Sequence, residues 1–223
     1  MSLNNIKAIA FYYKNFPLYS MPAGLINSFS THITPIVLIF AYNPTIAGFY
    51  ALTQRALGLP LTLVGQSISQ VYLSQAPELL QKDVYLVREL YKKVARNLFL
   101  VGVVPIILLG IFGEGIFTLV FGESWANSGV YLQVLFLMFI AQFTVAPLSQ
   151  TLNILNKQNI QLLWDITRVV VSMVTIIYPS KVLLLKPEIT LLIYSVSMSL
   201  LYIGLYFISL HYLKSKGDYN NTI

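Results

Sequence analysis

Residues 46–71 read IAGFYALTQRALGLPLTLVGQSISQV, and Arg55 is the one charged residue among them. About 20 mostly apolar residues are enough to cross the ~30 Å hydrocarbon core of a bilayer as a helix. At ~1.5 Å per residue, Arg55 lies roughly 14 Å from Ile46, near the middle of that core. An unpaired charge there costs at least ~2.5–3.5 kcal/mol, so such a residue usually faces a bundle interior or a hydrated cavity. The stretch therefore predicts a transmembrane helix that borders a polar pathway.

The composition of the whole chain indicates an integral membrane protein. Of its 223 residues, 57% are hydrophobic and only 10% are charged, and the mean hydropathy is +0.71. A soluble domain carries about 25% charged residues. The chain has no cysteine, and its two histidines, His32 and His211, lie far apart, so we expect neither a metal site nor another cofactor. The first apolar stretch has no cleavage-like end, so no signal peptide is expected.

Apolar length and the exclusion of charge predict six transmembrane helices. They cover residues 18–41, 46–71, 98–120, 130–152, 162–183 and 189–210. The polar segment 76–96 has the spacing of an amphipathic helix, and we expect it to be a cytoplasmic connector that extends the neighbouring spans or lies on the inner leaflet. The predicted fold is all-α, with residues 1–223 forming a single membrane domain, a six-transmembrane-helix bundle.

The basic residues lie mainly in the connections on one side of this predicted bundle. That side holds Lys7, Lys14, Lys82, Arg88, Lys92, Lys93, Arg96, Lys157, Lys214 and Lys216. Only Lys181 and Lys186 fall on the other side. By the positive-inside rule both termini are predicted to be cytoplasmic. This distribution accounts for the net charge of +6, so we do not expect a nucleic-acid partner.

Polar residues are concentrated in the first predicted span, between Pro22 and Pro35. Asn27 and Thr31 share one stripe by their i, i+4 spacing, and His32 lies beside them. Small and hydroxyl-bearing residues can serve close helix packing, but such a stripe can also line a hydrated cavity. Both interpretations remain open, and a lone histidine is more often a packing residue than a titrating group.

The second predicted span repeats this pattern around Arg55. It adds polar side chains at Gln54, Gln66 and Gln70. Pro60 removes a backbone hydrogen bond and, with Gly58, predicts a kink or hinge. Arg55 either contacts an anion or pairs structurally, for example with backbone carbonyls.

The remaining charged residues inside the spans do not indicate catalysis. Asp165 and Arg168 are spaced i, i+3, so they can neutralise each other, or they can reach water at the nearby interface. The chain contains no G-x-S-x-G, Walker A or metal-binding histidine motif, and no predicted span holds a pair of carboxylates. We therefore expect transport rather than enzymatic activity.

Several stretches of the chain resemble a known family of transporters. They are FPLYSMPAGLIN at 16–27, GFYALTQRALGLP at 48–60, VFGESW at 120–125 with GVY at 129–131, and PLSQ at 147–150 with Asn153. In this order they resemble the polysaccharide-biosynthesis flippases, the O-antigen translocases of the multidrug/oligosaccharidyl-lipid/polysaccharide exporter superfamily. The resemblance implies a bacterial inner-membrane protein of surface polysaccharide, O-antigen or lipopolysaccharide biosynthesis. Its implied substrate is an undecaprenyl-pyrophosphate-linked oligosaccharide.

The resemblance covers only the C-terminal half of such a transporter. Family members have about twelve or more spans in two six-helix lobes, and alternating access by rocking two repeats needs both. We therefore expect the chain to form one lobe and to require either a separate N-terminal half or another copy of itself.

In this reading the polar residues of the first two spans contact the substrate. Arg55 would bind the pyrophosphate through its fork of donors, and Gly58 and Pro60 would allow bending. The expected hydrogen-bonding residues are Asn27, Thr31, His32, Gln54, Gln66 and Gln70. One alternative is a truncated subunit that does not transport. Another is a small-molecule antiporter of the same superfamily. Intramembrane carboxylates would favour the antiporter, and we count only Asp165 within the predicted spans. A membrane glycosyltransferase or polymerase ranks last because the external loops are short.

Overall fold

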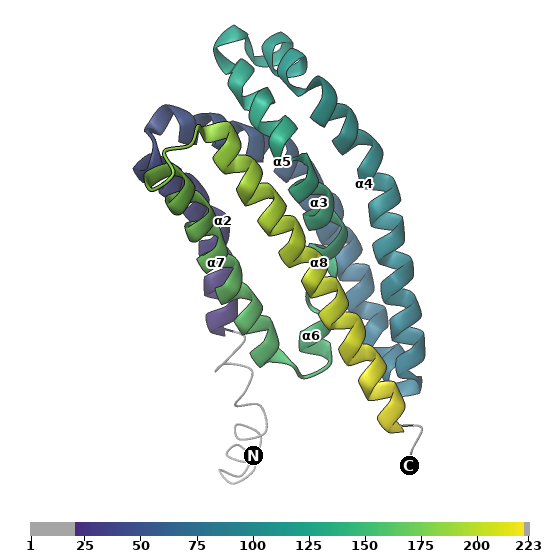
Figure 1. The fold of residues 1–223 in the computed structure, drawn as a ribbon. Coiled ribbons are helices and arrows are strands. Elements are labelled where there is room, and N and C mark those ends of the chain that lie inside the picture. The colour runs from purple at the N-terminus through teal and green to yellow at the C-terminus, as the bar shows by residue number, and fades with distance from the viewer. Residues whose placement is uncertain (1–20, 221–223) are drawn as a thin grey trace, which may run out of the picture.

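The computed structural model describes the backbone of residues 21–220 and the side chains of Ile26 and residues 32–215. This part of the chain is helical throughout and contains no strand. The elements are α2 (Met21–Ala41), α3 (Pro44–Lys82), α4 (Val84–Phe121), η2 (Glu123–Trp125), α5 (Ala126–Val145), η3 (Ala146–Leu148), α6 (Thr151–Ile154), α7 (Gln158–Lys181) and α8 (Pro187–Asn220). The long helices run roughly alongside one another in an elongated bundle (Figure 1). The all-α prediction is confirmed.

Four helical stretches are long and apolar enough to cross a membrane, among the residues that the structure describes. They are Val84–Phe121, Glu123–Ile154, Gln158–Lys181 and Pro187–Ser215. α3 is long enough but is not among them, because its arginine and glutamines make it too polar. In α2 the described side chains of His32–Ala41 form an apolar run. The chain is thus a membrane protein, and α3 is more polar than these four stretches.

The amphipathic spacing of the segment 76–96 predicted one helix, but the structure has two helices there. The segment is divided at Asp83, where the backbone is extended (φ −160°, ψ 130°) between the end of α3 and the start of α4. The Asp83 carboxylate accepts a hydrogen bond from the backbone N–H of Tyr85 (2.8 Å) and so caps α4. α3 and α4 therefore form one long helical hairpin with its tip at this residue.

The predicted span 130–152 also differs from a single helix. α5 ends at Val145 and gives way to the 3₁₀ turn η3 and the short α6. Pro147 lies in η3, and because it has no N–H it cannot continue the hydrogen-bond ladder of α5. The chain then reverses through Asn156, which adopts a left-handed conformation (φ 59°), before α7 begins.

The core of the bundle is built around α5, which contacts α3, α4 and α8. Its Leu135, Met138 and Phe139 are almost completely buried in the main apolar cluster. A second, smaller cluster lies near the tip of the α3–α4 hairpin, where Tyr72 and Tyr91 pack together. These two clusters fix α3 and α4 against the rest of the bundle.

Two glycines of α4, Gly102 and Gly113, allow α4 and α5 to approach closely. A Cβ on Gly113 would lie 2.8 Å from the carbonyl oxygen of Gly129, so only a hydrogen fits between the two backbones there. The ring of Phe143 lies against Gly102 in the same way. Small residues at helix contacts are how membrane helices gain van der Waals packing without a hydrophobic driving force.

Candidate functional site

The residues predicted to contact substrate lie mainly on α3, and one side of this helix is exposed. Arg55, Thr62, Gln66 and Gln70 are all exposed and fall within one sector of the helix, since they follow at i, i+7, i+11 and i+15. We call these four residues the polar face of α3. The buried side of the helix contacts α2, α4 and α5.

The Arg55 side chain is exposed, and no residue of the described part forms an ion pair or hydrogen bond with it. The structural pairing with backbone carbonyls, one of the two interpretations left open by the sequence, is not formed within that part. The guanidinium therefore remains available to a group outside this bundle. Gln66 and Gln70, about three and four turns further along α3, are exposed in the same direction.

Gln54 does not lie with Arg55, although the two are adjacent in the sequence. Successive residues of a helix point about 100° apart, and the Gln54 side chain is half-buried on another side of α3. Its amide nitrogen donates a hydrogen bond to the Tyr50 hydroxyl (2.9 Å). The Tyr50 ring meets that of Tyr194 edge-on at 6.5 Å, and the Tyr194 hydroxyl is 3.4 Å from Thr34 Oγ1. Gln54 thus belongs to a buried polar cluster between α2, α3 and α8.

The sequence interpretation missed this buried cluster. Its one local signal is the i, i+4 spacing of Tyr50 and Gln54, which allows a hydrogen bond along one helix. The partners from α2 and α8 are 16 and 144 residues away from Tyr50 along the chain, so nothing local points to them.

The predicted site residues of α2 are described only in part. His32 is exposed and forms no hydrogen bond with any residue of the described part. The side chains of Asn27 and Thr31 lie outside the described residues. α2 packs against α3 and α7, which places it beside the helix that carries the polar face.

The predicted hinge residues lie within α3 between Arg55 and Gln66. The helix continues through Gly58 and Pro60 from Pro44 to Lys82. Pro60 is exposed, and a Cβ on Gly58 would meet only Gln54 Oε1, at 3.7 Å. Neighbouring elements therefore leave room around this part of α3.

Comparison with protein families identifies the chain. A family model described as "polysaccharide biosynthesis protein" matches residues 5–130, which is more than half of the chain. The chain belongs to this family. No curated protein and no solved structure is found to match it. Within this polysaccharide biosynthesis protein, the matched region includes α2, α3 and α4, and so contains the whole polar face.

A buried ion pair of the polysaccharide biosynthesis protein lies on α7, away from the polar face. Arg168 Nη2 is 3.6 Å from Asp165 Oδ1, and the two side chains are only 8% and 2% exposed. Gln161 donates to the second carboxylate oxygen of Asp165 (3.2 Å), and the guanidinium stacks over the Trp164 ring at 4.9 Å. The prediction that the pair neutralises itself is confirmed, whereas the alternative that it reaches water is wrong.

From the sequence we counted Asp165 as the one carboxylate within the predicted spans. That count was wrong, because Glu114 lies within the predicted span 98–120 and within the apolar part of α4. Its side chain is exposed, about two turns before the end of the helix.

Within the described part of the chain, no three histidine or acidic residues come together as metal ligands would.

Proposed function

We propose that this membrane protein is one lobe of a flippase, equivalent to its C-terminal half. In this proposal it folds as six transmembrane helices with both termini in the cytoplasm. The flippase moves an undecaprenyl-pyrophosphate-linked oligosaccharide across the bacterial inner membrane for O-antigen or capsule biosynthesis. The observation that carries the proposal is the polar face of α3, in a member of the polysaccharide biosynthesis family.

The polar face is unsuited to contact with lipid. From Arg55 to Gln70 it extends about 22 Å along α3, most of the ~30 Å hydrocarbon core. Amides and a guanidinium exposed to hydrocarbon lose their hydrogen bonds, at a cost of several kcal/mol each. The face therefore requires water or a second protein surface, and a hydrated cavity between two lobes supplies both.

The chemistry of the polar face suits the proposed substrate. The planar guanidinium of Arg55 presents parallel donors that match phosphate oxygens in pairs. Gln66 and Gln70 offer amide donors and acceptors to the hydroxyl groups of a sugar. Translocation makes and breaks no covalent bond in the substrate, so the proposed role needs no catalytic residue.

The second lobe is either a separate N-terminal half or another copy of this chain. Two lobes that rock against each other expose the site to one side of the membrane at a time. A subunit that merely packs against a partner would also cover the polar face, but it would leave no hydrated path. Transport therefore distinguishes the two roles.

Complementation of a flippase-deficient strain tests the proposal. We expect surface polysaccharide to return when the chain is co-expressed with an N-terminal half, and Arg55→Ala to lower it about tenfold or more, as for a charge-assisted hydrogen bond. Lys93→Ala, which removes an exposed charge elsewhere, is the matched control. Absence of transport with every second lobe would favour the non-transporting subunit. Full transport by Arg55→Ala at a normal membrane level would refute the anion contact.

A further inference from the structure

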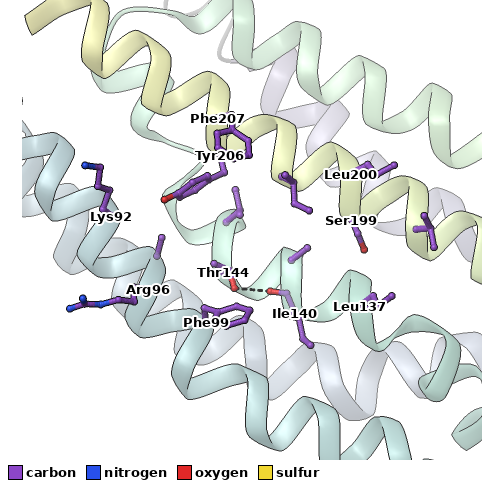
Figure 2. A pocket seen from close by; sticks show the side chains of 15 residues that line it. Lys92, Arg96, Phe99, Leu137, Ile140, Thr144, Ser199, Leu200, Tyr206 and Phe207 are labelled. Atoms are coloured by element: carbon purple, nitrogen blue, oxygen red, sulfur yellow. Dashed lines mark hydrogen bonds between the residues drawn. The ribbon is translucent and has the colours of Figure 1, made fainter.

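A groove between α4 and α8, with α5 as its floor, is separate from the polar face of α3. Its volume is about 580 Å³, and none of its lining residues belongs to α3 (Figure 2). The walls are mainly apolar, with Phe99, Leu137 and Leu200 among them. We call it the α4–α8 groove.

The two aliphatic hydroxyl groups in the walls of the α4–α8 groove are already hydrogen-bonded, and the third hydroxyl, that of Tyr206, lies at the end near Lys92 (Figure 2). Thr144 donates to the Ile140 carbonyl (2.8 Å) and Ser199 to the Ser195 carbonyl (2.7 Å), each within its own helix. The walls thus offer an occupant little beyond van der Waals contact. An apolar chain suits them better than a sugar or a peptide backbone.

One end of the groove is basic. Lys92 and Arg96 line it from α4, and Figure 2 shows both side chains at the same end. Arg88 lies one turn before Lys92 in the same i, i+4 row, and its Nε is buried with no hydrogen-bond partner among the described residues. Lys92 contacts Glu89 (2.9 Å) at an exposed position, whereas Arg96 has no ion pair within the described residues. The row keeps an excess of positive charge after that one pairing.

The length of the groove matches one leaflet of a bilayer. Its lining extends along α8 from Val196 to Phe207, which is about 16 Å at ~1.5 Å per residue. The hydrocarbon core of one leaflet is about half of ~30 Å. An acyl chain of a membrane lipid fits this depth, whereas a long polyprenyl chain exceeds it.

We propose that the α4–α8 groove binds a glycerophospholipid with an anionic headgroup from the surrounding membrane. One acyl chain lies in the apolar part, and the headgroup phosphate contacts Arg96 and Lys92. The inference is independent of the proposed flippase function, because the groove shares no residue with the polar face of α3. The bound lipid bridges α4 and α8, which also contact each other directly, as the rings of Tyr91 and Tyr206 do.

Quenching by brominated lipids tests this site on the full chain in nanodiscs. The two native tryptophans, Trp125 and Trp164, are outside the groove, so Phe99→Trp places a new reporter in its wall. We expect brominated phosphatidylglycerol to quench the new tryptophan at a several-fold lower mole fraction than brominated phosphatidylcholine. Lys92→Gln with Arg96→Gln should abolish this preference, because each basic residue near an anionic headgroup contributes up to about fivefold.

A matched double variant separates the site from overall charge. Lys82→Gln with Lys93→Gln removes the same number of charges from exposed positions outside the groove and should leave the preference intact. Equal quenching by the two lipids, or a preference that survives loss of Lys92 and Arg96, would overturn the proposal. So would displacement of phosphatidylglycerol by a smaller amount of polyprenyl phosphate. If the double variant fails to fold, Arg96→Gln alone, at an exposed side chain, gives the same comparison.

Discussion

Arg55 and its neighbour Gln54 show how one helix divides polar residues between two roles. Arg55 is exposed on the polar face of α3, while Gln54 is hydrogen-bonded to Tyr50 in the bundle. From the sequence we grouped the two residues because both interrupt an apolar run. The 100° between successive helical residues separates them, and only Arg55 remains accessible to a substrate.

The buried pair of Asp165 and Arg168 yields a prediction at the same scale. Removing one partner leaves an uncompensated buried charge, which costs about 3–5 kcal/mol, whereas apolar replacement of both is often neutral. We expect Asp165→Leu to lower the free energy of unfolding strongly, and the double variant Asp165→Leu with Arg168→Met to recover most of the loss. Chemical denaturation of the purified chain in detergent measures both. A double variant as unstable as the single one would mean that the two side chains are held by other partners.

The spacing of residues along one helix was enough to predict this ion pair, because both partners are on α7. The partners of Gln54 were not predictable beyond Tyr50, because Tyr194 and Thr34 come from other helices. Local periodicity determines which side of a helix a residue occupies. It does not determine which helix will cover that side.

At the scale of elements, the breaks between helices were harder to predict than the helices. Leu79, Val84, Val87 and Tyr91 have a spacing that fits one amphipathic helix across Asp83. The structure breaks there because Asp83 adopts an extended backbone and caps α4. Aspartate is a favoured N-cap, but it is also an ordinary polar residue on a helix surface, so the sequence alone does not decide between the two.

The close contact of α4 and α5 predicts an asymmetry between two glycines. A Cβ on Gly129 would collide with the backbone of Gly113 and Glu114, which cannot move away as a flexible side chain can. Gly129→Ala should therefore lower the free energy of unfolding by about 1–3 kcal/mol, as overpacking does. Gly115→Ala is the control, since nothing lies within 4 Å of its added Cβ, and it should be neutral or slightly stabilising. Thermal unfolding of both variants in the same detergent makes the comparison. Equal melting temperatures would show that α4 and α5 are not held at this distance.

At the scale of the whole molecule, the bundle has two kinds of exposed surface. α4 exposes large apolar residues such as Leu100 and Val104, as a helix in contact with lipid does. α3 exposes the polar side chains of Arg55, Gln66 and Gln70 among apolar ones such as Leu59 and Leu63. The sequence predicted this polar helix, but the side of the bundle that it would face depended on how α2, α4 and α5 pack around it.

The absence of cysteine from the chain allows this difference in surface to be tested directly. A single cysteine at Gln66 should react with a membrane-impermeant maleimide when the chain is co-expressed with an N-terminal half, because the proposed cavity between the lobes contains water. Leu100→Cys is the matched control, and it should remain unreactive because thiolates do not form in hydrocarbon. Addition of lipid-linked oligosaccharide should slow the reaction at residue 66 alone. If Gln66→Cys were as unreactive as Leu100→Cys in cells that make surface polysaccharide, the polar face would be packed against protein, and the hydrated path would have to lie elsewhere.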